Sequence, residues 1–292
     1  MTFGVEHRVV EKRNLADKIH LFKVVAPLVA RRAKPGQFVI VRSHERAERI
    51  PLTIVDSDPD NGTISLVVQE MGRGTAKIAE IGEGGKFAGI VGPLGRAGNI
   101  ASVNKVVLIA GGVGVAPMLP YARAYHSSGA HVTTIVGAKT RDMLILLDEI
   151  ESVSDVVMVS TDDGSLGVKG VVSDVLARLL ADGERFDHAV CIGPAVMMKA
   201  VCGLTREAGI PTTVSLNPIM VDGTGMCGGC RVTVGGEIKF ACVDGPGFDG
   251  HAVDFDELMS RQRFYEREER LSYDSYRTSK EGSHRCRLDQ IG

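Results

Sequence analysis

The sequence predicts a multidomain β and α/β protein: an N-terminal antiparallel β-barrel, a Rossmann-like parallel α/β domain and a small cysteine-rich C-terminal segment. Three observations predict this fold class. Short apolar runs alternate with turn residues up to about residue 99, and longer unbroken apolar runs alternate with helical stretches from Lys105 onward. Beyond residue 218, three of the six cysteines gather in a glycine-rich stretch. A chain of 292 residues is also too long for one ordinary small core.

We expect four parts along the chain. Residues 1–99 would form the barrel, residues 100–217 the parallel α/β domain, and residues 218–255 the cysteine-rich segment. Residues 256–292 would begin as a helix and continue as a polar tail.

The composition is that of an ordinary globular protein, with 44% hydrophobic and 24% charged residues. A formal net charge of −2 gives no field strong enough to recruit nucleic acid or an anionic membrane. The N-terminus lacks the unbroken apolar run of a signal peptide, and no stretch reaches the length of a transmembrane helix. We therefore expect a cytoplasmic protein whose cysteines are ligands, catalytic thiols or buried hydrophobic residues rather than disulfide partners.

Five short runs rich in Val and Ile predict the antiparallel strands of the barrel. They cover residues 7–13, 19–26, 36–43, 49–57 and 63–70. Pro, Gly, Asp and Asn separate them, and one helical stretch, residues 74–81, follows the fifth. Short apolar runs separated by turn residues are typical of a barrel or sandwich rather than of a parallel sheet.

The barrel also offers a candidate anion site. Its residues are Arg49, Pro51, Leu52 and Thr53 at the end of one predicted strand, and Gly72, Gly74 and Thr75 before the predicted helix. An arginine, a hydroxyl and a helix N-terminus capped by Thr75 are what a pyrophosphate needs. Each signal is weak alone, because a surface strand beside a capped helix is a common structural arrangement.

In the second domain, unbroken apolar runs predict parallel strands covered by helices on both faces of the sheet. These runs are residues 105–110, 131–138, 156–161 and 188–192. A glycine cluster follows the first run and opens a helix; it comprises Gly111, Gly112 and Gly114, with Pro117 in the first helical turn. Such glycines let the backbone turn sharply and approach a pyrophosphate at the helix N-terminus, whereas the alternative is a tight turn needed for packing alone.

A second strand–turn–helix unit carries Cys191, Gly193 and Pro194. Ligands bind outside the carboxyl ends of parallel strands, so these residues are expected to line the same crevice as the first glycine cluster. From composition alone, Cys191 is better interpreted as a small buried hydrophobic residue.

The cysteine-rich segment gives the sharpest signal. Cys227 and Cys230 are spaced C-x2-C, Cys242 follows after eleven intervening residues, and glycines let the loop wrap closely around a metal centre. A zinc knuckle and an iron–sulfur cluster of the C-x4-C-x2-C…C pattern both remain open. The iron–sulfur pattern would place a ligand at Asp222, and the more distant Cys202 and Cys286 are weaker candidates for the fourth donor.

Seven stretches fall in an order that resembles a known family. They are KPGQFVIV (34–41), RIPLTI (49–54), GRGTAKI (72–78), GPLG (92–95), IAGGVGVAPM (109–118), CIGPAVMM (191–198), and DGTGMCGGCRV with FACVDGPGFDGHAVDF (222–232 and 240–255). This order resembles the ferredoxin–NADP reductase superfamily and, more narrowly, the electron-transfer subunit of dihydroorotate dehydrogenase and its close relatives. Those relatives include the small subunits of the bifurcating NADH-dependent reduced ferredoxin:NADP oxidoreductase and of sulfide dehydrogenase. The resemblance extends from about Val9 to Glu257.

The resemblance implies an NAD(P)H-dependent oxidoreductase subunit with FAD in the barrel, a nicotinamide-nucleotide domain and a [2Fe–2S] cluster. Its site residues would fall into groups. Arg49, Pro51, Leu52 and Thr53 would hold FAD, with Gly74 and Thr75 at its pyrophosphate; Gly111, Gly112, Gly114, Pro117, Gly193 and Pro194 would surround the nicotinamide dinucleotide. The resemblance also places Cys191 near the stacked nicotinamide and flavin rings, against the interpretation from composition. Asp222, Cys227, Cys230 and Cys242 would hold the cluster.

One departure bears on the assignment. The dihydroorotate relative carries cysteine where this chain has Asp222, whereas the bifurcating small subunit resembles this chain in using aspartate. The pyrimidine-pathway subunit is therefore the second hypothesis. A third is a redox-responsive binding module without turnover, which would lack a flavin.

The resemblance implies NAD(H), although Lys139 and Arg141, after the strand at 131–138, could receive the 2′-phosphate of NADP(H). The implied partner in a heterodimer is a larger, glutamate-synthase-like subunit carrying flavin and iron–sulfur groups, with ferredoxin reached through that subunit. Residues 255–269 are a candidate docking segment, and a solvated charged helix is the alternative.

Overall fold

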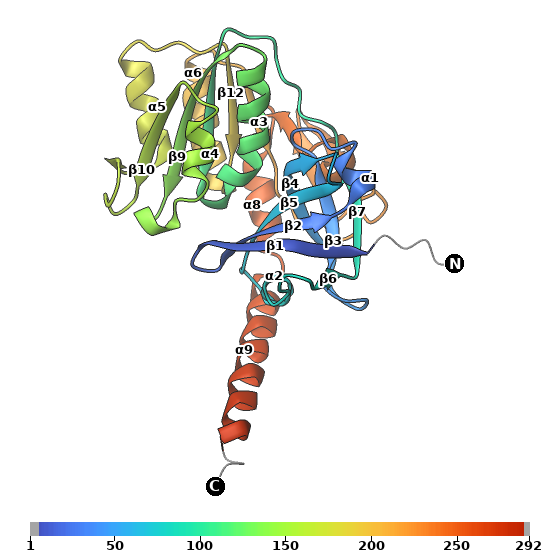
Figure 1. Ribbon diagram of the computed structural model, residues 1–292. Helices are drawn as coiled ribbons and strands as arrows, with labels where there is room; N and C mark the ends of the chain where they lie inside the picture. The colour runs from blue at the N-terminus through green and yellow to red at the C-terminus, as the bar shows by residue number, and fades with distance from the viewer. Residues whose placement is uncertain (1–5, 289–292) are drawn as a thin grey trace.

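The computed structural model describes residues 6–288, with side chains described up to Lys280. Figure 1 shows two lobes, each built on one sheet, and a long C-terminal helix that projects away from both. Cys286, named above as a weaker ligand candidate, lies outside the described side chains.

The first lobe is an antiparallel sheet of seven strands in the order β6-β1-β2-β5-β4-β3-β7. The strands are β1 (His7–Ala16), β2 (Ile19–Val25), β3 (Phe38–Arg42), β4 (Ile50–Asp58), β5 (Thr63–Gln69), β6 (Lys86–Phe87) and β7 (Gly89–Leu94). Only Ala88 separates the two edge strands, so the edges lie near each other and the barrel is nearly closed. Successive side chains along a strand point to opposite faces of the sheet, and those on the inner face, such as Phe22, Val39 and Leu66, form the fully buried core. The predicted antiparallel barrel is confirmed.

Two short helices belong to this lobe, α1 (Pro27–Ala30) and α2 (Arg73–Ala79). Gly72 occupies the N-cap of α2. Thr75 is the third residue of the helix, and its Oγ1 accepts hydrogen bonds from the backbone N–H groups of Met71 and Gly72 at 3.0 and 3.1 Å. Thr75 thus caps the helix N-terminus as predicted, but from the third helical position rather than from before the helix, because a side chain there reaches back toward the N-cap.

The second lobe is a mixed sheet in the order β11-β10-β9-β8-β12-β13-β16. Its strands are β8 (Lys105–Gly111), β9 (His131–Ala138), β10 (Val156–Thr161), β11 (Val168–Lys169), β12 (His188–Ile192), β13 (Thr212–Ser215) and β16 (Gly247–Asp249). All pairings are parallel except that of β16 with β13. The strand order reverses beside β8, which is the switch point where such sheets bind ligands. The predicted Rossmann-like domain is confirmed.

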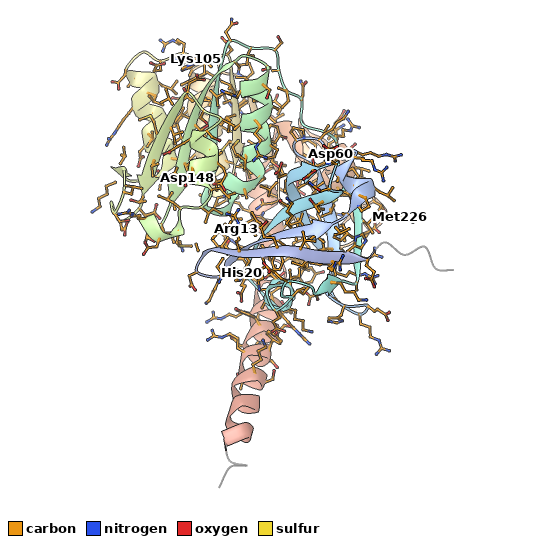
Figure 2. The ribbon with its side chains drawn as sticks, viewed as in Figure 1. Arg13, His20, Asp60, Lys105, Asp148 and Met226 are labelled. Atoms are coloured by element: carbon orange, nitrogen blue, oxygen red, sulfur yellow. The ribbon has the colours of Figure 1, made fainter. Side chains whose placement is uncertain are left out.

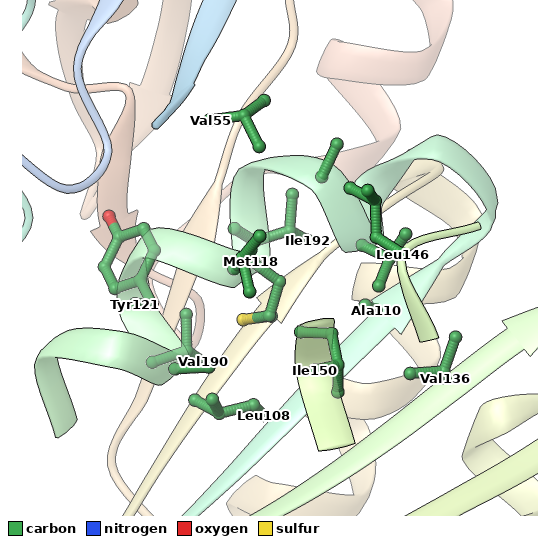
Figure 3. Close-up of a cluster of buried hydrophobic side chains, with 14 of the residues drawn as sticks. Val55, Leu108, Ala110, Met118, Tyr121, Val136, Leu146, Ile150, Val190 and Ile192 are labelled. Atoms are coloured by element: carbon green, nitrogen blue, oxygen red, sulfur yellow. The ribbon is translucent and has the colours of Figure 1, made fainter. Parts of the chain in front are cut away.

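Helices cover both faces of this sheet, as the unbroken apolar strands predicted. They are α3 (Val115–Ser127), α4 (Leu147–Glu151), α5 (Val172–Ala181) and α6 (Ala195–Glu207). One buried cluster joins α3 and α4 to the sheet, and Figure 3 shows Met118 and Ile150 of these helices gathered with Leu108 and Val190. A second cluster joins α5 and α6 to the opposite face.

The two lobes share a core where α3 meets β4. Val55 of the barrel is buried in the same cluster as Met118 of α3. Tyr121 is 1% exposed, and a Cβ atom at Gly98 would lie 2.4 Å from its hydroxyl oxygen. Arg123 donates to Asp56 at 2.6 Å across the same boundary. The barrel and the parallel sheet are thus fixed against each other by apolar packing and an ion pair.

The cysteine-rich segment forms a hairpin, β14 (Arg231–Val234) and β15 (Glu237–Phe240), followed by α7 (Ala241–Asp244). Cys230 and Cys242 are buried in one cluster with Phe38 and Ile40 of β3. The segment therefore packs on the barrel, while its strand β16 extends the parallel sheet.

The chain ends in two helices, α8 (Phe255–Gln262) and α9 (Glu266–Leu288). Asp254 caps α8 by accepting from the N–H of Glu257 at 2.9 Å, and Lys199 of α6 pairs with Asp256 at 2.7 Å. The sequence predicts a polar tail here, but helix α9 continues to Leu288 because its residues favour a helix even without an apolar face. Within residues 6–288, no helix combines the length and apolar character needed to cross a membrane.

Candidate electron-transfer site

The four predicted cluster ligands lie in one loop region on the barrel. Sγ of Cys230 lies 3.2 Å from Sγ of Cys242, and both thiols are buried and free of disulfides. Burial raises the pKa of Cys242 to about 12, and the thiol of Cys230 adds to the shift. The two sulfur atoms are therefore close enough to bind the same metal ion, and neither is used in a disulfide.

Cys227 differs from this pair because it is exposed. The N–H of Gly229 donates to its Sγ at 3.4 Å, and this contact, with that of the Asp222 N–H, lowers the pKa of the Cys227 thiol. The N–H of Gly225 similarly favours the thiolate of Cys242. Backbone N–H groups directed at sulfur stabilise a thiolate, which is the form that binds metal.

Glycines make this loop geometry accessible. Gly223, Gly225 and Gly228 have φ values of +84°, +89° and +66°, a left-handed conformation that side chains rarely adopt. A Cβ atom at Gly225 would lie 2.8 Å from Val243. Figure 2 places Met226, next to Cys227 and 88% exposed, beside the barrel and far from Lys105 and Asp148 of the second lobe.

Asp222 is engaged on both carboxylate oxygens. Its Oδ2 accepts from the N–H of Thr224 at 2.8 Å and from that of Met226 at 3.4 Å, and its Oδ1 lies 3.4 Å from Nη1 of Arg49. Hydrogen bonds from Thr224 are the main cause that lowers the pKa of Asp222. The predicted cluster ligand therefore contacts a predicted flavin ligand, a pairing that the sequence could not reveal across 173 positions.

The donor set can be tested against the two metal centres that the sequence left open. Among the side chains described, residues 6–280, no three His, Cys, Asp or Glu groups surround a common point as a single metal ion requires. Sγ of Cys230 and Sγ of Cys242 form one neighbouring pair, and Cys227 lies beside Asp222 through the backbone N–H of that residue. A dinuclear iron–sulfur centre takes two protein ligands on each iron, so these residues fit such a cluster better than a zinc ion.

The predicted flavin residues lie on and before β4. Arg49 precedes the strand, and its side chain is 52% exposed. Leu52 is buried in the barrel core, whereas Pro51 and Thr53 are half-buried. Gly74 lies beside this strand: a Cβ atom there would be 3.0 Å from Ile50 and 2.4 Å from Oε2 of Glu48.

The glycine cluster stands where β8 ends and α3 begins. A Cβ atom at Gly114 would lie 2.3 Å from the carbonyl oxygen of Ile192, and one at Gly111 would lie 2.3 Å from Sδ of Met197. A Cβ atom at Gly193 would lie 3.3 Å from the backbone nitrogen of Gly111. The structure thus brings the two predicted turns together at the switch point, with Pro194 at the N-cap of α6 and Pro117 in the first turn of α3.

Cys191 is buried in the core of the second lobe. Its side chain is 0% exposed and belongs to the apolar cluster with Val107, Ile109 and Cys202. Burial raises the pKa of the Cys191 thiol well above its ordinary value. The structure places this residue in the core, as composition suggested, and a position beside the nicotinamide remains a prediction.

Sequence reasoning missed residues that the fold brings beside the predicted nucleotide site. Asp162 and Asp163 follow β10, and their N–H groups donate to the carbonyl oxygens of Ala138 and Lys139 at 3.1 and 3.3 Å. The backbones of both residues therefore lie near the end of β9, and Oδ1 of Asp163 accepts hydrogen bonds from the N–H and the hydroxyl of Ser165 at 3.0 and 2.6 Å. No local signal could reveal this, because the contact depends on parallel pairing of β9 with β10.

Comparison with known proteins follows this division of the chain. Residues 217–254 match the iron–sulfur cluster binding domain of dihydroorotate dehydrogenase B. Residues 108–203 match the oxidoreductase NAD-binding domain.

Several relatives and solved structures match over most of the chain. A Thermotoga maritima protein described as a dihydroorotate dehydrogenase B (NAD(+)) electron transfer subunit homolog is 47% identical, covering 92% of this chain and 95% of its own. A probable electron transfer subunit of the same enzyme from Methanocaldococcus jannaschii is 36% identical, covering 76% and 81%. A structure of the electron-bifurcating NADH-dependent reduced ferredoxin–NADP oxidoreductase superposes with a TM-score of 0.88 at 45% identity, covering 94% of this chain and 99% of that chain. Phthalate dioxygenase reductase, with a TM-score of 0.57 at 17% identity and 79% and 86% coverage, shares the fold. The chain belongs to the oxidoreductase family of dihydroorotate dehydrogenase B electron transfer subunits and their homologues.

Proposed function

We propose that this chain is the small subunit of an electron-bifurcating ferredoxin:NADP oxidoreductase or of a sulfide dehydrogenase. It would exchange electrons with NAD(H) at FAD and pass them through a [2Fe–2S] cluster to a larger flavin and iron–sulfur subunit. The observation that carries this proposal is the near full-length match, at 45% identity, to a chain of the bifurcating oxidoreductase. Aspartate at position 222 supports the same choice.

Each part of the chain would have one task. Residues 1–99 would hold FAD, with Arg49, Pro51 and Thr53 near it and Gly74 and Thr75 at its pyrophosphate. Residues 100–217 would hold the nicotinamide dinucleotide at Gly111, Gly112 and Gly114, beside Gly193 and Pro194. Residues 218–255 would hold the cluster, and residues 256–292 would contribute to contacts with the partner subunit. These domain limits and residue roles form part of the proposal.

The bound groups would supply hydride acceptance from the nicotinamide and onward passage of single electrons. The protein would hold the nucleotide, the flavin and the cluster in position relative to one another. The glycines at the ends of β8 and β12 allow the two turns to pack closely, Gly112 among them has open space beside it for the dinucleotide, and the cluster loop lies against β3 of the barrel. Arg49 contacts Asp222, so this contact would fix the position of the cluster loop relative to the flavin.

NAD(H) is the proposed nucleotide. Exposed carboxylates of Asp162 and Asp163 near the end of β9 suit the free 2′-hydroxyl of NAD(H) and would repel the 2′-phosphate of NADP(H). Exposed Lys139 and Arg141, on the loop that follows β9, would instead favour the phosphate, and a direct comparison of the two nucleotides decides between them. Rapid mixing of the anaerobic protein with each nucleotide should bleach the flavin faster with NADH; faster bleaching by NADPH would contradict the assignment.

The second candidate is the electron transfer subunit of dihydroorotate dehydrogenase itself, because relatives 30–36% identical carry that description. The two candidates differ in the partner subunit. Co-expression of this chain with each class of partner and co-purification would separate them. A stable complex only with a dihydroorotate dehydrogenase catalytic subunit would favour this second candidate.

A further inference from the structure

We propose that helix α9 forms one wall of a site for the adenosine-phosphate half of FAD, with Tyr276 and Lys280 as binding residues. This inference rests on the proposed flavin in the barrel and extends its site to a part of the chain outside the residues that the resemblance covers. It assigns a ligand-binding role to a helix that otherwise projects from the body (Figure 1).

The site is a hollow between the barrel and α9. Its volume is about 360 Å³, within the range of small-molecule sites. The lining residues are Ser43 and His44 after β3, Lys77, Glu80 and Ile81 on or after α2, and Tyr276 and Lys280 on α9.

A second, smaller hollow of about 170 Å³ adjoins the first and reaches the predicted pyrophosphate position. The two hollows share Ser43, His44 and Lys77, and the smaller one is also lined by Gly74. A dinucleotide whose pyrophosphate lies at Gly74 would therefore extend along these shared residues toward Tyr276. The isoalloxazine half would extend in the other direction, toward Arg49 and Thr53.

Contacts between α2 and α9 hold this wall in place. The Tyr276 hydroxyl donates to Oε1 of Glu80, and Nζ of Lys280 pairs with the same oxygen. Nζ of Lys77 lies 5.9 Å from the Tyr276 ring centroid, and Nζ of Lys280 lies 5.4 Å from it. Glu80 thus fixes the ring and the ammonium group at the edge of the hollow.

The charges around the two hollows suit a phosphate-bearing ligand. Four cationic side chains line them, Arg46, Arg73, Lys77 and Lys280, against the carboxylates of Glu48 and Glu80. Glu80 is already compensated by Lys280, so the remaining balance is positive. The ammonium groups of Lys77 and Lys280 lie over the half-buried ring of Tyr276, and a purine would stack on this ring as these two flexible side chains turn toward the phosphates.

The test compares FAD with FMN, because FMN lacks the adenosine-phosphate half. Flavin would be removed from the full chain, and each flavin titrated back while its fluorescence is followed. For Tyr276→Ala and Lys280→Ala, the Kd for FAD should rise about tenfold while the Kd for FMN stays unchanged. Tyr276→Phe keeps the ring and should retain FAD binding within about twofold if stacking dominates.

Arg277→Ala is the matched control, because it removes an exposed cation from the next position of the same helix. It should leave both dissociation constants unchanged, and circular dichroism would show that each variant is folded. Equal losses for FAD and FMN, or no loss for either, would overturn the role of α9. A wild-type chain that binds neither flavin would instead overturn the proposed function.

Discussion

Asp222 is the residue on which the choice between relatives depends. Replacing it with cysteine would exchange a hard oxygen donor for a soft thiolate and also remove the carboxylate that contacts Arg49. Asp222→Cys should therefore change both the electron paramagnetic resonance spectrum and the midpoint potential of the reduced cluster. Asp256→Cys introduces a thiol on α8, where Asp256 pairs with Lys199, and should change neither. An identical spectrum and potential in Asp222→Cys would show that Asp222 is not a ligand.

The reactivity of the Cys191 thiol tests whether its position in the core excludes a role at the flavin. Burial raises the pKa of Cys191 well above its ordinary value and that of Cys202 to about 12, so both thiols stay protonated and covered at pH 8. Iodoacetamide should therefore leave both unmodified in the folded, cluster-free protein and modify the exposed Cys227. Mass spectrometry of peptides gives the result, and unfolding in urea should make all three reactive. Rapid modification of Cys191 in the folded protein would favour a position at the nucleotide crevice.

Residue spacing identified positions where the backbone leaves no space for a side chain. At Gly111, Gly114 and Gly193 the structure shows that lack of space against Met197 and the Ile192 backbone, and their approach to a pyrophosphate stays a prediction. Thr75 was assigned to the wrong position of its helix, and the pairing of Asp222 with Arg49 was not predicted. Both depend on geometry that residue spacing does not encode: a helix boundary in the first case, and contact between distant segments in the second.

At the scale of elements, the junction of β8 with α3 is held by backbone contact. Gly114→Ala would place a methyl group 2.3 Å from the Ile192 carbonyl oxygen, so it should lower the free energy of unfolding by about 1–3 kcal/mol and weaken nucleotide binding. Gly203→Ala is the control: it lies within α6 with open space around it and should stabilise the protein by about 0.5–1 kcal/mol. Urea denaturation measures both. Equal stability of Gly114→Ala and the wild type would contradict the close packing.

The pairing of β12 with β13 predicts a pH dependence of stability. Nε2 of His188 lies 3.0 Å from Oγ1 of Thr213, and burial lowers the pKa of His188 below 6.5, although Asp249 opposes this. The unfolded chain then binds more protons below pH 6.5 than the folded chain, so the free energy of unfolding should fall as the pH drops from 7.5 to 5.5.

The slope should stay below the limit of about 1.4 kcal/mol per pH unit for one proton, because the ring is partly exposed. Urea denaturation of the wild type and of His188→Gln at three pH values checks this. The variant should show a shallower acid dependence. Parallel curves for the two proteins would show that His188 remains unperturbed.

Element types followed from apolar periodicity, which is why the barrel strands and the parallel strands were both predicted. The length of α9 was not, because a helix with a polar surface has no apolar period to detect. The position of β16 at the edge of the parallel sheet was also not predicted, since a three-residue strand leaves no pattern.

For the whole molecule, packing joins the three parts of the chain in one continuous series. The proposed nucleotide site lies at the ends of β8 and β12, the barrel packs on α3, and the cluster loop packs on β3 of the barrel. The order of these parts in the sequence predicted the domains, but not how they contact each other. Those contacts, through Tyr121, Val55 and Arg49, join residues distant in the sequence.

The most direct test of the account is anaerobic addition of NADH to the purified chain, followed by optical absorption and by electron paramagnetic resonance at low temperature. The account predicts a yellow-brown protein whose flavin band bleaches and which then shows the spectrum of a reduced [2Fe–2S] cluster. A colourless protein, or a flavin that bleaches while no reduced cluster is formed, would contradict it.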